Sequence, residues 1–278
     1  MIPWDETLIA VALAAYTLGA LALIAYFFSR EEWFVKVGAP LAVAGCAAQF
    51  VQLIVRYETT HVWPLLNLYG SLSLFSAMSV AIFIGFAARY RIWFAGGFVL
   101  ALAAIFLAYG VTWYEGTMPP VPSLQSYWAK IHVPIVVSSY AAFLVAFVFS
   151  CIYLFKYYAQ RRAGSGAVAG WLAALPSLPA LDVIVYRAVA IGLPLISVGI
   201  ITGAMWAHEA WGAYWQWDPK ETAALFSWIV YLAYMHLHTR SAWRGLRTNW
   251  VSVVGFLSII FCYLGVNIWI SGLHSYKV

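Results

Sequence analysis

Eight apolar runs of about 20 residues recur along this chain, and they restrict its fold more than any other feature. A helix of ~20 residues is roughly 30 Å long, which matches the hydrocarbon core of a bilayer. Continuous runs favour helices over the alternating strands of a barrel, because backbone groups in lipid need internal partners. We expect spanning helices at about 7–28, 35–56, 67–88, 92–110, 133–156, 184–205, 221–239 and 250–271.

The composition agrees with an all-α, polytopic membrane bundle. Hydrophobic residues make up 64% of the chain and charged residues only 9%, with a mean hydropathy of +0.84, which excludes a soluble globular domain. We therefore expect one integral membrane domain over residues 1–278. No basic segment precedes the first run, so we expect it to be retained as a helix and not cleaved as a signal peptide.

The basic residues predict the orientation, because they are retained in cytoplasmic loops. One side of the predicted topology holds four of them, Arg56, Lys130, Lys220 and Lys277. The other side holds eleven: Arg30, Lys36, Arg89, Arg91, Lys156, Arg161, Arg162, Arg187, Arg240, Arg244 and Arg247. Both termini are thus expected to face outward. The net charge of +5 is a topology signal, and we expect no nucleic-acid partner.

The three cysteines, Cys46, Cys151 and Cys262, fall in different predicted helices and form no CxxC or CxxCH motif. Small apolar core residues are their expected role. The chain is therefore not itself expected to be a c-type cytochrome.

Residues 206–221 read WAHEAWGAYWQWDPKE and place four tryptophans between two apolar runs, on the predicted outer side. So many flat rings suggest a platform for a large planar ligand such as haem. An interfacial aromatic belt is the alternative, although belts are usually dispersed over many helix ends. The end of the segment, Asp218 to Glu221, has the N-cap, the proline and the glutamate of a capping box, so it is expected to start the next helix.

Histidines within or beside a membrane are costly, which makes them functional candidates. His132 and His274 fall at the outer ends of two predicted helices and could supply both axial ligands of one haem. The alternative is an interfacial histidine with an apolar body and a polar tip. His236 and His238 are about 200° apart on a helix, so at most one of them faces the interior. The other is expected beside Arg240, at the cytoplasmic boundary.

Residues 175–222 closely resemble the tryptophan-rich WWD region of the CcsA/ResC family of cytochrome c biogenesis system II. Four other segments are similar to parts of the same family: HVWPLLNLYGSL (61–72), YWAKIHVPIVVSSYAA (127–142), HLHTR (236–240) and NIWISGLHSY (267–276). Two positions depart from the family pattern. Gly70 replaces a glutamate, and Ala223 replaces a tryptophan.

The resemblance implies a set of site residues. His132 and His274 would ligate the iron of haem b at an external site, and His238 would ligate iron within the membrane. It leaves the roles of His61, His208 and His236 open. The wall of the external site would be formed by Trp211, Gly212, Tyr214, Trp215, Trp217 and Asp218.

The same resemblance implies a function. The chain would transport haem across the membrane and present it for attachment to the CxxCH motif of apocytochrome c, as part of a holocytochrome c synthase. The implied partners are a CcsB/ResB-type membrane protein, apocytochrome c, thiol-reducing proteins and membrane lipid. A bacterial plasma membrane is favoured over a thylakoid. Two alternatives stay open: a HemX-type regulator of haem synthesis and a small-solute transporter.

Overall fold

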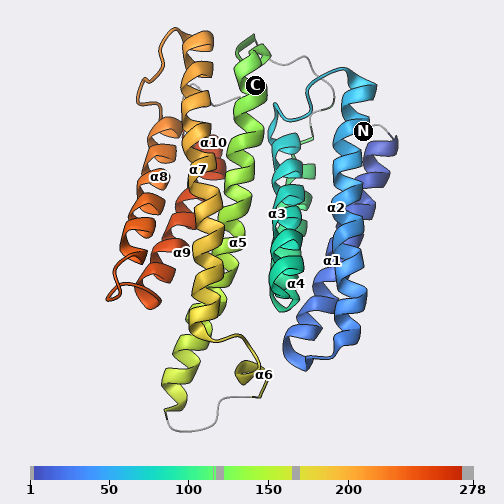
Figure 1. The fold of residues 1–278 in the computed structure, drawn as a ribbon. Helices are drawn as coiled ribbons and strands as arrows, with labels where there is room; N and C mark the ends of the chain where they lie inside the picture. Colours follow the sequence, from blue (N-terminus) through green and yellow to red (C-terminus); the bar gives the residue numbers. More distant parts are fainter. Residues whose placement is uncertain (1–2, 115, 117–121, 165–169, 271–278) are drawn as a thin grey trace. The chain divides into compact units, whose positions relative to one another are not determined.

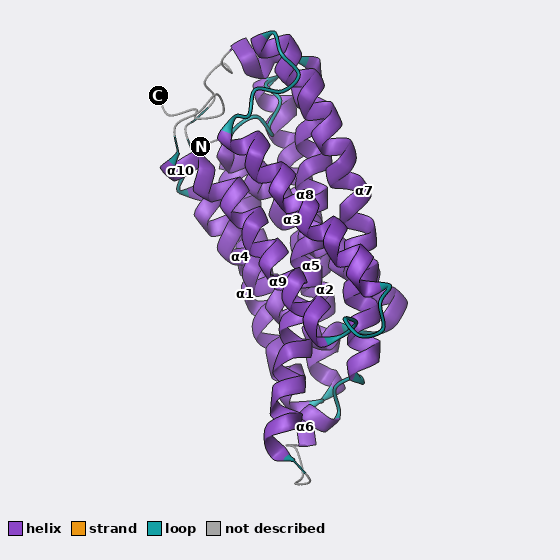
Figure 2. Ribbon diagram, turned by 90° about the vertical axis from the view of Figure 1, so that its left-hand side faces the viewer, coloured by secondary structure: helices purple, strands orange, loops and turns teal. Residues whose placement is uncertain are grey.

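The computed structural model describes residues 3–114, 116, 122–164 and 170–270 of the 278-residue chain. Every regular element among these residues is helical (Figures 1 and 2). The chain divides into two compact units, Met1–Ala141 and Ala142–Val278. The prediction of an all-α protein is therefore confirmed for the described residues.

The first unit is built from antiparallel neighbours joined by short connections, drawn in blue to green in Figure 1. Its helices are α1 (Pro3–Ser29), α2 (Glu32–Thr60), α3 (Leu68–Tyr90) and α4 (Gly96–Val111), with 3₁₀ turns at Trp93–Ala95 and Pro122–Gln125. Aromatic rings meet edge to face between the helices. The ring centroids of Phe27 and Phe98 are 5.0 Å apart, and those of Phe75 and Phe106 are 4.9 Å apart.

The second unit contains the larger part of α5 (Tyr127–Ala163), which begins in the first unit. Stacked rings join α5 to its neighbours, since Phe143 lies 3.6 Å from Tyr231 and Phe147 lies 4.7 Å from Phe256 between ring centroids. A π turn at Phe261–Gly265 interrupts the last helical stretch. The remaining helices are α6 (Gly170–Ala173), α7 (Leu178–Trp211), α8 (Pro219–His238), α9 (Leu246–Ile260) and α10 (Val266–Trp269).

Each of the eight predicted runs overlaps helical structure, and several helices are longer than predicted. α7 begins at Leu178 and ends at Trp211, whereas the predicted run covered 184–205. Seven helical stretches are long and apolar enough to cross a membrane: Trp4–Ser29, Glu32–Thr60, Leu68–Tyr90, Trp93–Val111, Tyr127–Ala163, Leu178–Trp211 and Leu246–Trp269. α8 is not among them, although its 20 residues measure about 30 Å. The placement of both termini outside depends on α8 crossing as well, and stays a prediction.

Candidate functional site

The tryptophan-rich segment 206–221 joins α7 to α8. Trp206 and Trp211 lie in the last turns of α7, and Gly212 is the residue that caps its end. Gly212 has a left-handed backbone (φ 80°), and its N–H donates to the carbonyl oxygen of His208 at 2.9 Å. Glycine adopts this conformation without a Cβ clash, which makes it a common helix end. The connection of residues 212–218 carries the other rings: Tyr214, Trp215 and Trp217.

The rings of this segment pack in pairs and leave aromatic surface uncovered. Trp206 is buried, whereas Trp217 is 68% exposed and Tyr214 is 52% exposed. Uncovered rings suit a wall for a planar ligand, and they equally suit an interfacial belt. The three pairs, with their centroid distances, are Trp206 with Trp211 (5.2 Å), His208 with Tyr214 (4.2 Å, stacked) and Trp215 with Trp217 (5.6 Å, edge to face).

The predicted capping box is confirmed at the start of α8. The Asp218 carboxylate accepts from the N–H of Lys220 at 2.9 Å. The Oε2 atom of Glu221 accepts from the N–H of Asp218 at 3.2 Å and from the N–H of Gln216 at 2.8 Å. Trp217 has a positive φ of 57°, which is strained for a non-glycine residue. Glu221 therefore binds the backbone N–H groups on both sides of Trp217.

A second contact ties the start of α8 to the end of the last helical stretch. The ammonium of Lys220 donates to Oδ1 of Asn267 at 2.8 Å, and the Asn267 amide donates to the carbonyl oxygen of Tyr263 at 2.8 Å. Burial lowers the pKa of Lys220 below its ordinary value. The connection is thus held both by its own cap and by the turn after the π segment.

His238 is the buried histidine of α8, with 9% of its surface exposed, and His236 is exposed. The prediction that at most one of the two faces the interior is confirmed. The Nε2 atom of His238 lies 2.9 Å from Oδ2 of Asp182 on α7. Its ring is stacked against Tyr186 and Tyr234, with centroid distances of 4.6 and 5.7 Å. α7 and α8 thus hold the imidazole from several sides.

Asn249 on α9 completes this centre. Its side-chain amide donates to the other carboxylate oxygen of Asp182 at 2.9 Å and to the carbonyl oxygen of Gly245 at 2.8 Å. Nearby polar atoms remain without a hydrogen-bond partner among the described residues, including the Tyr234 hydroxyl and Oδ1 of Asn249. The sequence reasoning missed Asp182 and Asn249, because the predicted runs began at residues 184 and 250.

The other predicted ligands are only partly described. His132 lies half-buried on α5, and His274 lies outside the described residues. The proposed pairing of these two histidines at one iron therefore stays a prediction. His61 ends α2 with a left-handed backbone (φ 53°). Among the described residues, no group of three or more histidine, cysteine or acidic residues is arranged to hold a metal ion.

Gly70, which replaces the family's glutamate, has no room for a side chain. A Cβ built on it would lie 1.6 Å from the carbonyl oxygen of Pro64. Its N–H donates to Oδ1 of Asn67, the N-cap of α3, at 2.8 Å. The loop before α3 thus folds directly over Gly70, which excludes an acidic side chain at this position in this fold.

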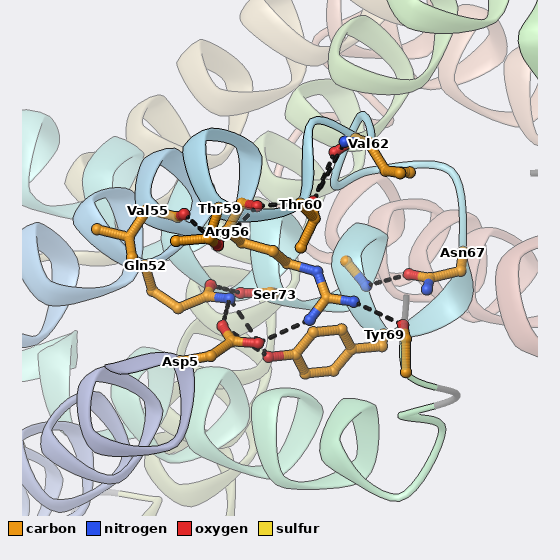
Figure 3. Close-up of polar contacts among 12 residues, drawn as sticks. Asp5, Gln52, Val55, Arg56, Thr59, Thr60, Val62, Asn67, Tyr69 and Ser73 are labelled. Carbon is orange, nitrogen blue, oxygen red and sulfur yellow. Dashed lines mark hydrogen bonds and ion pairs between the residues drawn. The ribbon is translucent and has the colours of Figure 1, made fainter. Parts of the chain in front are cut away.

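A second buried polar cluster joins α1, α2 and α3 in the first unit (Figure 3). Nη1 of Arg56 donates to Oδ2 of Asp5 at 2.7 Å, and both side chains are buried. The guanidinium carbon lies 4.7 Å from the ring centroid of Tyr69 and 5.0 Å from that of Tyr114, so the cation sits against two aromatic rings. Gln52 and Tyr69 donate to the other oxygen of Asp5. No sequence motif pointed to this cluster.

The fold and these centres define a polytopic helical membrane protein with an aromatic connection and a buried histidine–carboxylate pair. The model of one family, "Cytochrome C assembly protein", matches residues 65–274, about three quarters of the chain. The chain belongs to this family. The match covers the segment 206–221 and the buried histidine His238, and it places the chain in cytochrome c biogenesis.

Curated relatives named "Cytochrome c biogenesis protein CcsA" match between 58% and 98% of the chain. The protein from Guillardia theta is 31% identical, with 96% of this chain and 92% of the relative covered. The protein from Prochlorococcus marinus (strain MIT 9303) is 34% identical, with 98% and 94% covered. The protein from Synechococcus sp. (strain RCC307) is 42% identical over 58% of each chain. The resemblance to the CcsA family is therefore confirmed.

One solved structure, "Cytochrome c Heme Lyase CcmF", has a similar fold, with a TM-score of 0.67 at 18% identity. The similarity covers 95% of this chain and 47% of the CcmF chain. The chain thus spans about half the length of CcmF, and the likeness is one of fold.

Proposed function

We propose that this chain carries haem b across the membrane and presents it for covalent attachment to the CxxCH motif of apocytochrome c. The observation that carries this proposal is the family match over residues 65–274, which includes the aromatic connection and His238. In the attachment, two cysteine thiols of the apocytochrome add to the two vinyl groups of haem and form thioethers. The chain's contribution is orientation, because a thiol held against a vinyl group reacts as if the step were unimolecular.

We assign the outer site to the end of the membrane domain that carries the aromatic connection. His132 and His274 would be the axial ligands there, and two neutral imidazoles would fill both axial positions of the iron. The uncovered rings of Tyr214 and Trp217 support a wall for a porphyrin face. The full proposed wall is Trp211, Gly212, Tyr214, Trp215, Trp217 and Asp218.

Within the membrane, His238 would supply one ligand. Histidines that bind metals usually donate their other ring N–H to a carboxylate. The Nε2 atom of His238 faces the Asp182 carboxylate in this way, so the imidazole fits this role. No other hydrogen bond to the ring is formed within the described residues, which leaves Nδ1 available for a ligand. Tyr186 stacks on the face of the ring and would hold the imidazole plane in position.

A CcsB/ResB-type membrane protein would supply the second intramembrane ligand, and thiol-reducing proteins would keep the apocytochrome reduced. Together the two membrane proteins would form the holocytochrome c synthase. We place the chain in a bacterial plasma membrane, with the segment 206–221 on the outer side of a single membrane domain. The relatives come from bacteria and from algae, so the family supports several host membranes.

The test is replacement of the outer histidines. His132→Gly and His274→Gly should each abolish c-type cytochrome assembly in cells that depend on this chain, and added imidazole should restore part of it by occupying the vacated position. His61→Gly is a matched control, since His61 is exposed and its left-handed backbone suits glycine. Normal cytochrome assembly by both ligand variants would overturn the assignment of the axial ligands.

A further inference from the structure

A hollow of about 390 Å³ lies at the turn between α8 and α9, at the end of α8 opposite the aromatic connection. It is lined by His236, Leu237, Arg240, Ala242 and Trp243. Arg247 contacts two of these lining residues. Its guanidinium carbon lies 4.9 Å from the ring centroid of Trp243, and Nη1 donates to the carbonyl oxygen of Ala242 at 3.4 Å. The lining of the hollow thus combines apolar residues with the cation Arg240.

Among the residues that the structure describes, the arginines of this turn have no acidic partner. Arg240 forms no side-chain hydrogen bond or ion pair among the described residues, and no aspartate or glutamate occurs between residues 222 and 278. The second unit has four acidic residues, Asp182, Glu209, Asp218 and Glu221. Asp182 is bonded to His238 and Asn249, and the other three lie at the far end of α7 or α8, about 30 Å away along the helix. An anion from outside the chain would balance this charge.

An apolar stripe on α8 leads to the hollow. Phe226, Ile229, Ala233, His236 and Arg240 follow one another at spacings of three and four residues, so they share one face of the helix. Phe226 is 56% exposed and Ile229 is 49% exposed, and Ala233, His236 and Arg240 are also exposed. One face of α8 is therefore apolar along its length and basic at its end, which is complementary to an anionic amphiphile.

His238 points away from this face, because it is about 200° from His236 on the helix and packs on Asp182. A molecule in the hollow is consequently separate from the proposed intramembrane ligand. Trp243 and the arginines also match the residue types that meet lipid headgroups at a bilayer surface. We propose that the hollow binds the phosphate headgroup of an anionic phospholipid, with an acyl chain along the exposed face of α8.

The experiment uses the full chain, purified in detergent and titrated with phosphatidylglycerol or phosphatidylcholine, with bound lipid counted by native mass spectrometry. Arg240→Ala/Arg247→Ala should weaken phosphatidylglycerol binding by about tenfold or more, since each basic residue near an anionic headgroup contributes appreciably. The matched control is Arg161→Ala/Arg162→Ala, which removes two exposed charges at the end of α5. This control should leave the affinity within about twofold of the wild type.

Several outcomes would overturn the proposal. Equal losses for the two arginine pairs would show general charge attraction and no built site. A second such outcome is that the Arg240→Ala/Arg247→Ala variant binds phosphatidylglycerol as the wild type does while its thermal unfolding without added lipid is also unchanged. That result would exclude the hollow as the lipid-binding site. A parallel titration with iron protoporphyrin IX tests whether the anion is a haem propionate and not a lipid phosphate. If the propionates occupy the hollow and phosphatidylglycerol is not preferred, the lipid assignment is wrong.

Discussion

The imidazole of His238 lies 2.9 Å from the carboxylate of Asp182, a residue that precedes it by 56 positions in the chain. Asp182→Ala should lower the free energy of unfolding by about 1–3 kcal/mol, because two buried donors, on His238 and Asn249, lose their acceptor. Thermal unfolding of the purified chain measures this effect. Val183→Ala is the control, since Val183 is its exposed neighbour on α7. An Asp182→Ala melting curve that matches the control would contradict the prediction.

The Asp5–Arg56 pair predicts a non-additive mutant cycle. Breaking a buried ion pair by removing one partner costs about 3–5 kcal/mol, whereas removing both charges costs much less. We therefore expect Asp5→Asn or Arg56→Gln alone to lower the unfolding temperature more than the double variant does. Thermal unfolding of the three variants and the wild type gives the coupling energy. Simple addition of the two single effects would show that the pair contributes no coupling.

Gly70 is expected to tolerate no larger residue. Gly70→Ala places a Cβ against the Pro64 carbonyl, so it should destabilise the chain by more than the ~1–3 kcal/mol of ordinary overpacking. The yield of folded protein and its melting temperature are the measurements. Gly85→Ala provides the control on the same helix, because its Cβ would meet nothing within 4 Å. The clash is refuted if both variants fold equally well.

Glu221 should hold the aromatic connection in shape. Glu221→Ala removes the acceptor for the N–H groups of Gln216 and Asp218, which is one half of the capping box, while Asp218 still accepts from Lys220. Protease cleavage within residues 212–218 should become faster. Glu221→Gln retains a side-chain oxygen acceptor at the same distance from the backbone. The protease should therefore cleave this variant at a rate near that of the wild type. Faster cleavage in both variants would assign the effect to charge and not to the cap.

The outer wall predicts a loss of haem without a loss of protein. Trp215→Leu/Trp217→Leu should reduce the haem bound per purified chain, measured by absorption, while membrane insertion continues. Trp4→Leu/Trp33→Leu is matched in chemistry, since both residues are exposed tryptophans outside the connection. Disappearance of the Trp215/Trp217 variant from the membrane would instead favour an interfacial belt.

The sequence predicted the helices well and several buried polar residues poorly. A hydropathy pattern favours runs that begin at apolar residues, so three predicted runs began just after Asp5, Asp182 and Asn249. Each of these residues lies within a helix, where a polar partner from another helix compensates its burial. Such partners are distant in sequence, and a local pattern cannot reveal them.

Local chemistry was a better guide at the aromatic connection. The capping box follows from the spacing of Asp218 and Glu221 alone, and it is present. The ring pairs are different, because the stacking of His208 on Tyr214 depends on how the left-handed Gly212 turns the chain back. Motif spacing predicts a helix start, whereas the direction in which a short connection folds depends on its backbone angles.

The π turn at Phe261–Gly265 has a consequence for the angular register of the helical stretch that follows it. A π turn accommodates one more residue than an α turn, and one residue advances a helix by about 100°. Deletion of a single residue there would swing Asn267 away from the Lys220 ammonium without altering either side chain. The number of residues in this one turn thus sets which face of α10 points toward the tryptophan-rich connection.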